Sequence, residues 1–111
     1  MSVRTLITVP PQVRRGEVFT VSSTIRHAME TGYRRSAEGA MMPRDLIRRF
    51  TAHYEVAGSS KLIFAADLFA AIAANPYLAF AMRADSSGIL VLMWAGDGGF
   101  QHVERAPIEV A

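Results

Sequence analysis

The sequence has no cysteine among its 111 residues. This absence excludes disulfide bonds, thiolate metal ligands and a cysteine nucleophile within the chain. Long hydrophobic runs are absent as well: no apolar stretch approaches the roughly 20 residues that span a bilayer, and residues 1–12 contain no apolar segment of signal-peptide length. From these features alone we expect a soluble cytoplasmic protein that does not enter a membrane.

Lysine is almost absent too, because eleven of the twelve basic residues are arginine. Residues 1–50 carry nine arginines against four acidic residues, and residues 51–111 carry three basic residues against six acidic ones, so a net +5 is followed by a net −3. This asymmetry fits either a solubilising composition or forked contacts with oxyanions. Nucleic acid is not an expected partner, since no basic stripe with interleaved aromatic residues occurs.

The residues that build catalytic centres do not form a constellation. His27, His53 and His102 lie apart, and none is spaced for metal binding with another histidine or an acid on one element. The paired serines lack the glycines of a nucleophile elbow, and no helix or lysine follows the glycines at 96–99 as a phosphate loop requires. We therefore expect no metal, no cofactor and no enzymatic activity. His27 is expected to pack at the end of a sheet with one ring nitrogen hydrogen-bonded.

Alternation of apolar and polar residues with period two recurs along the chain and indicates strands with one buried face. One row comprises Phe19, Val21 and Ile25. A second row runs over even positions from Leu46 to Val56, with Arg48 as the exception. We expect a single domain over residues 1–111, an all-β, immunoglobulin-like antiparallel β-sandwich of about seven strands.

The remaining segments complete this prediction. A kinked first strand is expected over 9–18 with a turn at Gly16, and buried strands over 76–84 and 89–95 joined by a hairpin-type loop at 85–88. Residues 96–99 form the next turn, and Pro107 places the last strand at an edge or a bulge. Residues 61–66 are expected to form a strand, followed by a helical turn over 70–74 that ends before Pro76.

The connection from Ala28 to Arg44 is about 17 residues long, well above the usual ~4–6 of compact domains. Two interpretations remain open. It is a cross-connection of the sandwich, with Gly32 and Gly39 supplying unusual backbone angles, or it is a loop that another protein recognises.

Five motifs occur in a fixed order: GEV (16–18), HAMETGYR (27–34), MPRDLIRRF (42–50), NPYLAF (75–80), and Trp94 before a glycine-rich turn. Together they resemble the SoxZ family over nearly the whole chain. The resemblance implies a non-enzymatic, immunoglobulin-like subunit that pairs with SoxY, whose C-terminal cysteine carries sulfur intermediates between the Sox enzymes of thiosulfate oxidation. It also implies transient docking to those enzymes, and a periplasmic location reached by export with the signal-bearing partner.

The motif residues give a predicted partner interface. It comprises His27, Met29, Glu30, Gly32, Tyr33, Arg34, Pro43, Arg44, Asn75, Pro76, Tyr77 and Phe80. Arginines there could favour docking of a chain end that bears an anionic sulfur adduct. The alternative is a free-standing β-sandwich adaptor or an anion-binding module.

Overall fold

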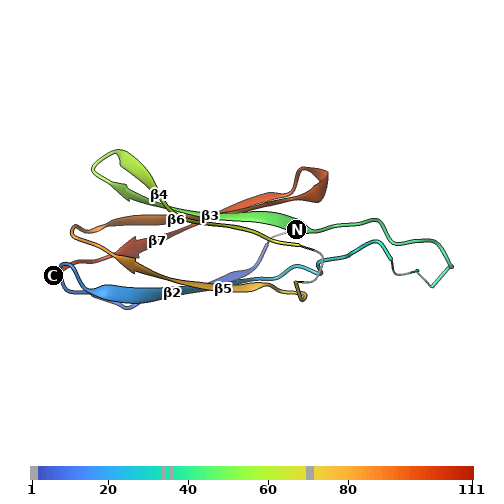
Figure 1. Cartoon of the computed structure of the whole chain (residues 1–111), viewed down its shortest axis with the longest axis horizontal. Coiled ribbons are helices and arrows are strands. Elements are labelled where there is room, and N and C mark those ends of the chain that lie inside the picture. The colour runs from blue at the N-terminus through green and yellow to red at the C-terminus, as the bar shows by residue number, and fades with distance from the viewer. Residues whose placement is uncertain (1–2, 34, 36, 70–71) are drawn as a thin grey trace.

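The chain folds into two antiparallel β-sheets packed face to face (Figure 1). The structure is a computed structural model that describes residues 3–33, 35, 37–69 and 72–111. One sheet has the order β1-β2-β5, with strands Thr5–Thr8, Val18–Ile25 and Tyr77–Arg83. The other has the order β4-β3-β6-β7, with strands Ser59–Asp67, Ile47–Val56, Gly88–Gly96 and Gln101–Ile108. The predicted seven-stranded, immunoglobulin-like β-sandwich is confirmed.

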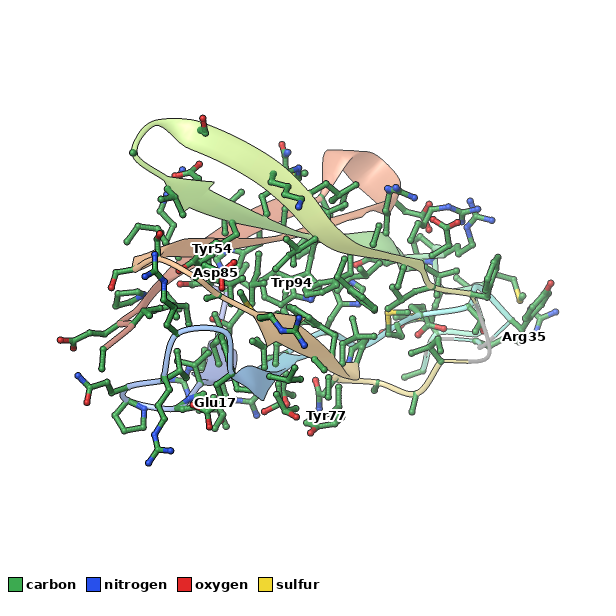
Figure 2. The ribbon with its side chains drawn as sticks, turned by 60° about the vertical axis from the view of Figure 1, so that its left-hand side comes forward. Glu17, Arg35, Tyr54, Tyr77, Asp85 and Trp94 are labelled. Carbon is green, nitrogen blue, oxygen red and sulfur yellow. The ribbon has the colours of Figure 1, made fainter. Side chains whose placement is uncertain are left out.

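Alternate residues of the strands meet between the sheets and form the core. Val21 and Ile25 face inward from β2, as the alternation predicts, and both are fully buried. The ring of Phe50 lies 5.2 Å from that of Trp94 and 6.1 Å from that of Phe64, in tilted and edge-on arrangements that aromatic pairs favour. Figure 2 shows Trp94 in the middle of the molecule. Both ring pairs join strands of the four-stranded sheet, and the inward-facing side chains of β2 belong to the same buried cluster, which lies between the two sheets.

A β-bulge explains why Arg48 interrupts the apolar row of β3. The pairing of β3 with β6 shifts in register between Ile47 and Arg49. The extra residue turns Ile47 into the core and leaves Arg48 exposed. The bulge lies at the first residues of β3, directly after the long connection.

Two sequence predictions about connections are wrong. Regular pairing at the N-terminus occurs at Thr5–Thr8, not over 9–18, where Val13 forms only an isolated bridge with Val110. Residues 85–88 do not close a hairpin, because β5 and β6 belong to different sheets. A short polar turn is compatible with a hairpin and with a crossing between sheets, and here the Tyr54 hydroxyl, donating to the Ser86 carbonyl at 2.6 Å, holds the crossing.

Other predictions of local structure agree with the structure. Residues 97–99 form a 3₁₀ turn between the paired strands β6 and β7. Pro107 lies on the edge strand β7, and the strand predicted over 61–66 falls within β4. The predicted helical turn over 70–74 includes residues 70 and 71, which lie outside the described part of the chain. No helix among the described residues is long and apolar enough to cross a membrane.

Candidate functional site

The long connection between β2 and β3 forms an arm, defined here as residues 28–45. Glu30 and Asp45 pair as an isolated antiparallel bridge, with N–H···O distances of 2.8 and 2.7 Å in the two directions. Further out, Arg35 pairs with Met41. The arm is therefore an irregular hairpin, and it extends beyond one end of the sandwich, which we call the arm end (Figure 1). The molecule measures 57 × 24 × 22 Å.

His27 joins the base of the arm to the β4–β5 connection. Its backbone N–H donates to the Oδ1 atom of Asn75 at 2.9 Å, and its carbonyl accepts the N–H of Asn75 at 2.6 Å. The side chain is only 7% exposed, and the ring packs edge-on against Phe100 at 5.2 Å. The sequence prediction of a histidine packed at the sheet end is confirmed.

The ring nitrogens of His27 have different partners. Nδ1 accepts the N–H of Met29 at 3.0 Å, which places the proton of the neutral ring on Nε2. Nε2 is buried and lies 3.5 Å from the Oδ1 atom of Asp45. The ring thus joins the outgoing and the returning segment of the arm at its base.

Met29 and Gly32 set the path of the arm. Met29 has a φ of 53°, is 5% exposed, and its sulfur accepts the N–H of Ile47 at 3.3 Å. Gly32 has a φ of 89°, and a Cβ atom there would approach the Cβ of Arg44 to 3.2 Å. Gly39, near the tip, has a φ of 84°. The unusual backbone angles predicted for Gly32 and Gly39 are confirmed, and left-handed conformations of this kind favour glycine.

Asp97, in the β6–β7 turn, clamps the returning chain of the arm. Its carboxylate accepts the N–H of Leu46 at 3.0 Å and two guanidinium N–H groups of Arg44 at 3.1 and 3.3 Å. Arg48 lies 3.5 Å away. Partial burial alone would raise the pKa of Asp97, but the Leu46 N–H and the two guanidinium groups outweigh it and lower this pKa below 3.8. Asp97 is thus held as a carboxylate that ties the arm to the sheet.

Large exposed apolar side chains gather at the arm end. Tyr33 and Met41 on the arm are 84% and 49% exposed, and Phe69 and Ile72 on the β4–β5 connection are 69% and 40% exposed. Tyr77, at the start of β5, is 65% exposed. Figure 2 shows Arg35 far out on the arm and Tyr77 on the three-stranded sheet. Aromatic residues and methionine are enriched in protein–protein interfaces, so this end has the composition of a docking surface.

The structure brings most of the predicted interface residues to this end. Tyr33 and Tyr77 are exposed there, and the group at the arm base comprises His27, Glu30, Gly32, Pro43, Arg44, Asn75 and Pro76. Met29, Pro76 and Phe80 are buried, and the ring of Phe80 stacks on that of Phe64 at 4.8 Å, so these three side chains act from within the fold. Arg34 lies outside the described residues.

Sequence reasoning missed the role of Asp97 and the exposure of Met41 and Phe69. Asp97 is 53 residues from Arg44, and only the pairing of β3 with β6 brings the two together. The exposure of Met41 and Phe69 cannot be inferred from residue type alone. Among the residues that the structure describes, no group of three or more histidine and acidic side chains could hold a metal ion.

The family of the chain follows from its sequence. The model of the family described as sulphur oxidation protein SoxZ matches residues 7–107. This chain belongs to the SoxZ family. Membership implies a role in the Sox sulphur-oxidation system, as a subunit of a carrier complex rather than as a catalytic chain. No curated protein sequence matches the chain at a significant level.

Solved structures with the same fold include a superoxide reductase and a sulfur carrier protein. A superoxide reductase (neelaredoxin) from Ignicoccus hospitalis has a TM-score of 0.76 at 18% identity, covering 96% of this chain and 80% of that one. The sulfur carrier protein SoxY from Chlorobium limicola f thiosulfatophilum has a TM-score of 0.65 at 14% identity, covering 96% and 78%. Identities this low show the fold alone.

Proposed function

We propose that this chain is the non-catalytic subunit of a sulfur carrier complex and pairs with a SoxY-like subunit that bears the reactive cysteine. The match to the SoxZ family over residues 7–107 is the observation that carries this proposal. The chemistry agrees with it, because the 111 residues contain no thiol to which a sulfur intermediate could be bonded. The thiol is then supplied by the partner, and this chain supplies shape and a docking surface.

The arm end is the surface that we assign to the partner. Tyr33 and Met41 extend from the sandwich on a hairpin, and Phe69, Ile72 and Tyr77 lie exposed on neighbouring connections. A stable heterodimer buries at least ~1,200 Å² in total, and its central contacts are commonly aromatic. A projecting hairpin can add its two faces to the area that the end of the sandwich provides.

The arginines at the arm base stabilise the fold, so we no longer assign them to binding an anionic group of the partner. Arg44 is bound by the carboxylate of Asp97, and Arg48 lies beside it, so this carboxylate already occupies part of the N–H donors of each guanidinium. They hold the arm against the β6–β7 turn instead. A pre-ordered arm loses less conformational entropy on association than a mobile one, which favours affinity.

Export with the partner is part of the same proposal. The fold of this chain is formed from its own residues, so it can associate with a signal-bearing subunit before transport and reach the periplasm as a complex. Cell fractionation tests this point. The chain is expected in the periplasm when it is co-expressed with a partner that carries its export signal, and in the cytoplasm when that signal is deleted.

The pairing is tested by binding measurements on matched double variants. Tyr33→Ser with Met41→Ser removes the exposed apolar side chains of the arm. As the control, Leu62→Ser with Val103→Ser removes two exposed apolar side chains, at 50% and 43%, from the four-stranded sheet. If the arm end is the interface, the first pair should weaken binding to the SoxY-like subunit by at least about tenfold, since truncating a central contact costs more than 1 kcal/mol. The second pair should leave affinity unchanged. Loss of affinity only in the second pair would move the interface to the four-stranded sheet and refute this assignment.

A further inference from the structure

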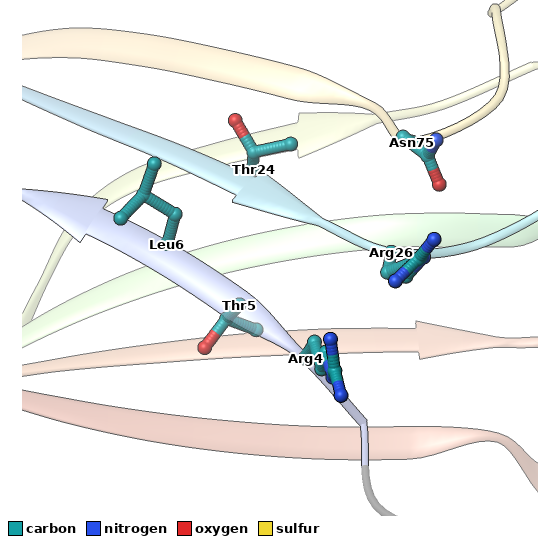
Figure 3. Close-up of a pocket in the computed structure, with 6 residues that line it drawn as sticks. All are labelled: Arg4, Thr5, Leu6, Thr24, Arg26 and Asn75. Atoms are coloured by element: carbon teal, nitrogen blue, oxygen red, sulfur yellow. The ribbon is translucent and has the colours of Figure 1, made fainter.

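A second feature at the arm end lies on the outer face of the three-stranded sheet. Arg4, Leu6, Thr24, Arg26 and Asn75 line a shallow hollow of about 360 Å³, together with Thr5 (Figure 3). The hollow extends across the ends of β1 and β2 to Asn75, two residues before β5. It contains no acidic side chain among its lining residues.

The two arginines face each other across neighbouring strands. Thr5 of β1 is paired with Ile25 of β2, and one step further along the Arg26 N–H donates to the Arg4 carbonyl at 2.9 Å. Like charges directly opposite each other on adjacent strands repel and destabilise the pairing. Neither arginine has an ion pair or a side-chain hydrogen bond with any described residue. An anion between them would replace this repulsion with two attractions.

Asn75 and Thr24 add neutral donors to the hollow. The Oδ1 atom of Asn75 is occupied by the N–H of His27, which leaves both hydrogens of its amide nitrogen without an acceptor among the described residues. Thr24 lies two residues before Arg26 on the same face and offers a hydroxyl group. Leu6, opposite Thr24 and 67% exposed, supplies an apolar wall.

We propose that this hollow binds a tetrahedral oxyanion of sulfur, either free or as the sulfonate end of a side chain. Each guanidinium presents a fork of N–H donors that fits two oxygens of such a group, and the amide and the hydroxyl group can reach a third. A flat carboxylate would leave part of this donor set unused. The choice of sulfur as the central atom rests on the proposed function, whereas the oxyanion chemistry rests on the residues alone.

The hollow is open to solvent, which sets the kind of binding. Charge-assisted hydrogen bonds at an exposed site are screened by salt, so affinity should fall as ionic strength rises. Such weak, salt-sensitive binding suits an anionic group that must be bound briefly and then released.

The test is an NMR titration of the full chain, ¹⁵N-labelled, with sulfate, thiosulfate and methanesulfonate as probes at constant ionic strength and with chloride as the reference anion. Saturable shifts are expected at the Nε–H groups of Arg4 and Arg26 and at the side-chain amide of Asn75. Arg4→Gln and Arg26→Gln should each weaken binding at least about tenfold, the factor that corresponds to one lost interaction of 1.4 kcal/mol. Arg4→Lys and Arg26→Lys, which keep the charge and lose the fork, should fall between these variants and the wild type.

Arg105→Gln, at an exposed arginine on β7, is the matched control and should bind as the wild type does. Tighter binding of the two inorganic anions would assign the site to a free ion, and tighter binding of methanesulfonate would assign it to a sulfonated chain end. Shifts that do not saturate, that chloride reproduces, or that Arg105→Gln reduces equally would overturn the proposal. Because the titration uses this chain without a partner, its failure leaves the pairing with SoxY untouched, and failure to pair leaves the titration interpretable.

Discussion

Asn75 contributes to the arm end through its side chain and through its backbone, and three substitutions separate the two. The side chain accepts the N–H of His27 at 2.9 Å, and the backbone has a φ of 53°. Such a hydrogen bond contributes about 1 kcal/mol net. A left-handed backbone costs an ordinary residue about 1.5 kcal/mol, and asparagine tolerates it better than most.

Asn75→Ala loses the acceptor and adds the strain, so it should destabilise the protein by about 2.5 kcal/mol. Asn75→Gly loses the acceptor without strain but makes the unfolded chain more flexible, for a cost of about 1.5–2 kcal/mol. Asn75→Asp keeps an acceptor and the tolerance of positive φ, and should stay within about 0.5 kcal/mol of the wild type.

Urea denaturation measures these differences, and thermal unfolding should show a lower Tm by roughly 10 °C for the alanine variant, at about 4 °C per kcal/mol for a chain of this size. The order of stability predicted is aspartate, then glycine, then alanine. An alanine variant as stable as the glycine variant would refute the contribution of the backbone, and a glycine variant as stable as the wild type would refute that of the hydrogen bond.

Three further substitutions test the core, the arm base and the clamp. Phe50→Ala removes a fully buried ring that contacts Trp94, so it should lower the free energy of unfolding by about 3–5 kcal/mol in urea titrations, and a loss below 1 kcal/mol would contradict the packing described. In Gly96→Ala, the new Cβ atom would clash with the carbonyl oxygen of Leu46, so the start of β3 must shift. Hydrogen exchange at the Leu46 amide should then be faster, and an unchanged rate would argue against this close approach. Asp97→Asn removes a carboxylate whose pKa is lower in the folded than in the unfolded chain, so the wild type should lose this stabilisation as the pH falls below 3.8. The variant should lose less stability in urea titrations across the same pH range, and equal acid sensitivity of the two proteins would exclude the clamp.

The strands were predictable because their periodicity is local. Val21 and Ile25 belong to an apolar row with a period of two, and this period indicates a strand with one buried face. The bulge beside Arg48 was visible only as an exception to the row, since the cause lies in the register with β6. Residues 85–88 misled because turn chemistry specifies a reversal of the chain and not the sheet to which the next strand belongs.

The candidate site was predictable in part for the same reason. The connection after β2 is unusually long and contains glycines, and these features indicated an unusual segment. The asparagine–proline pair at 75–76 indicated the β4–β5 connection, which contacts the arm base. The clamp by Asp97 depends on contacts across 53 residues, and no local signal reports it. The exposure of Met41 and Phe69 depends on where the arm and the β4–β5 connection leave the sandwich, which residue type alone cannot indicate.

Hydrogen exchange of the chain, alone and co-expressed with a cysteine-bearing SoxY-like subunit, shows whether the arm end binds this partner. Native mass spectrometry of the same sample reports whether a complex of both chains is present. We expect a complex in which peptides from the arm, residues 28–45, and from the β4–β5 connection exchange more slowly than in the free chain. Masses of the separate chains alone, or slower exchange confined to the outer face of the four-stranded sheet, would contradict it.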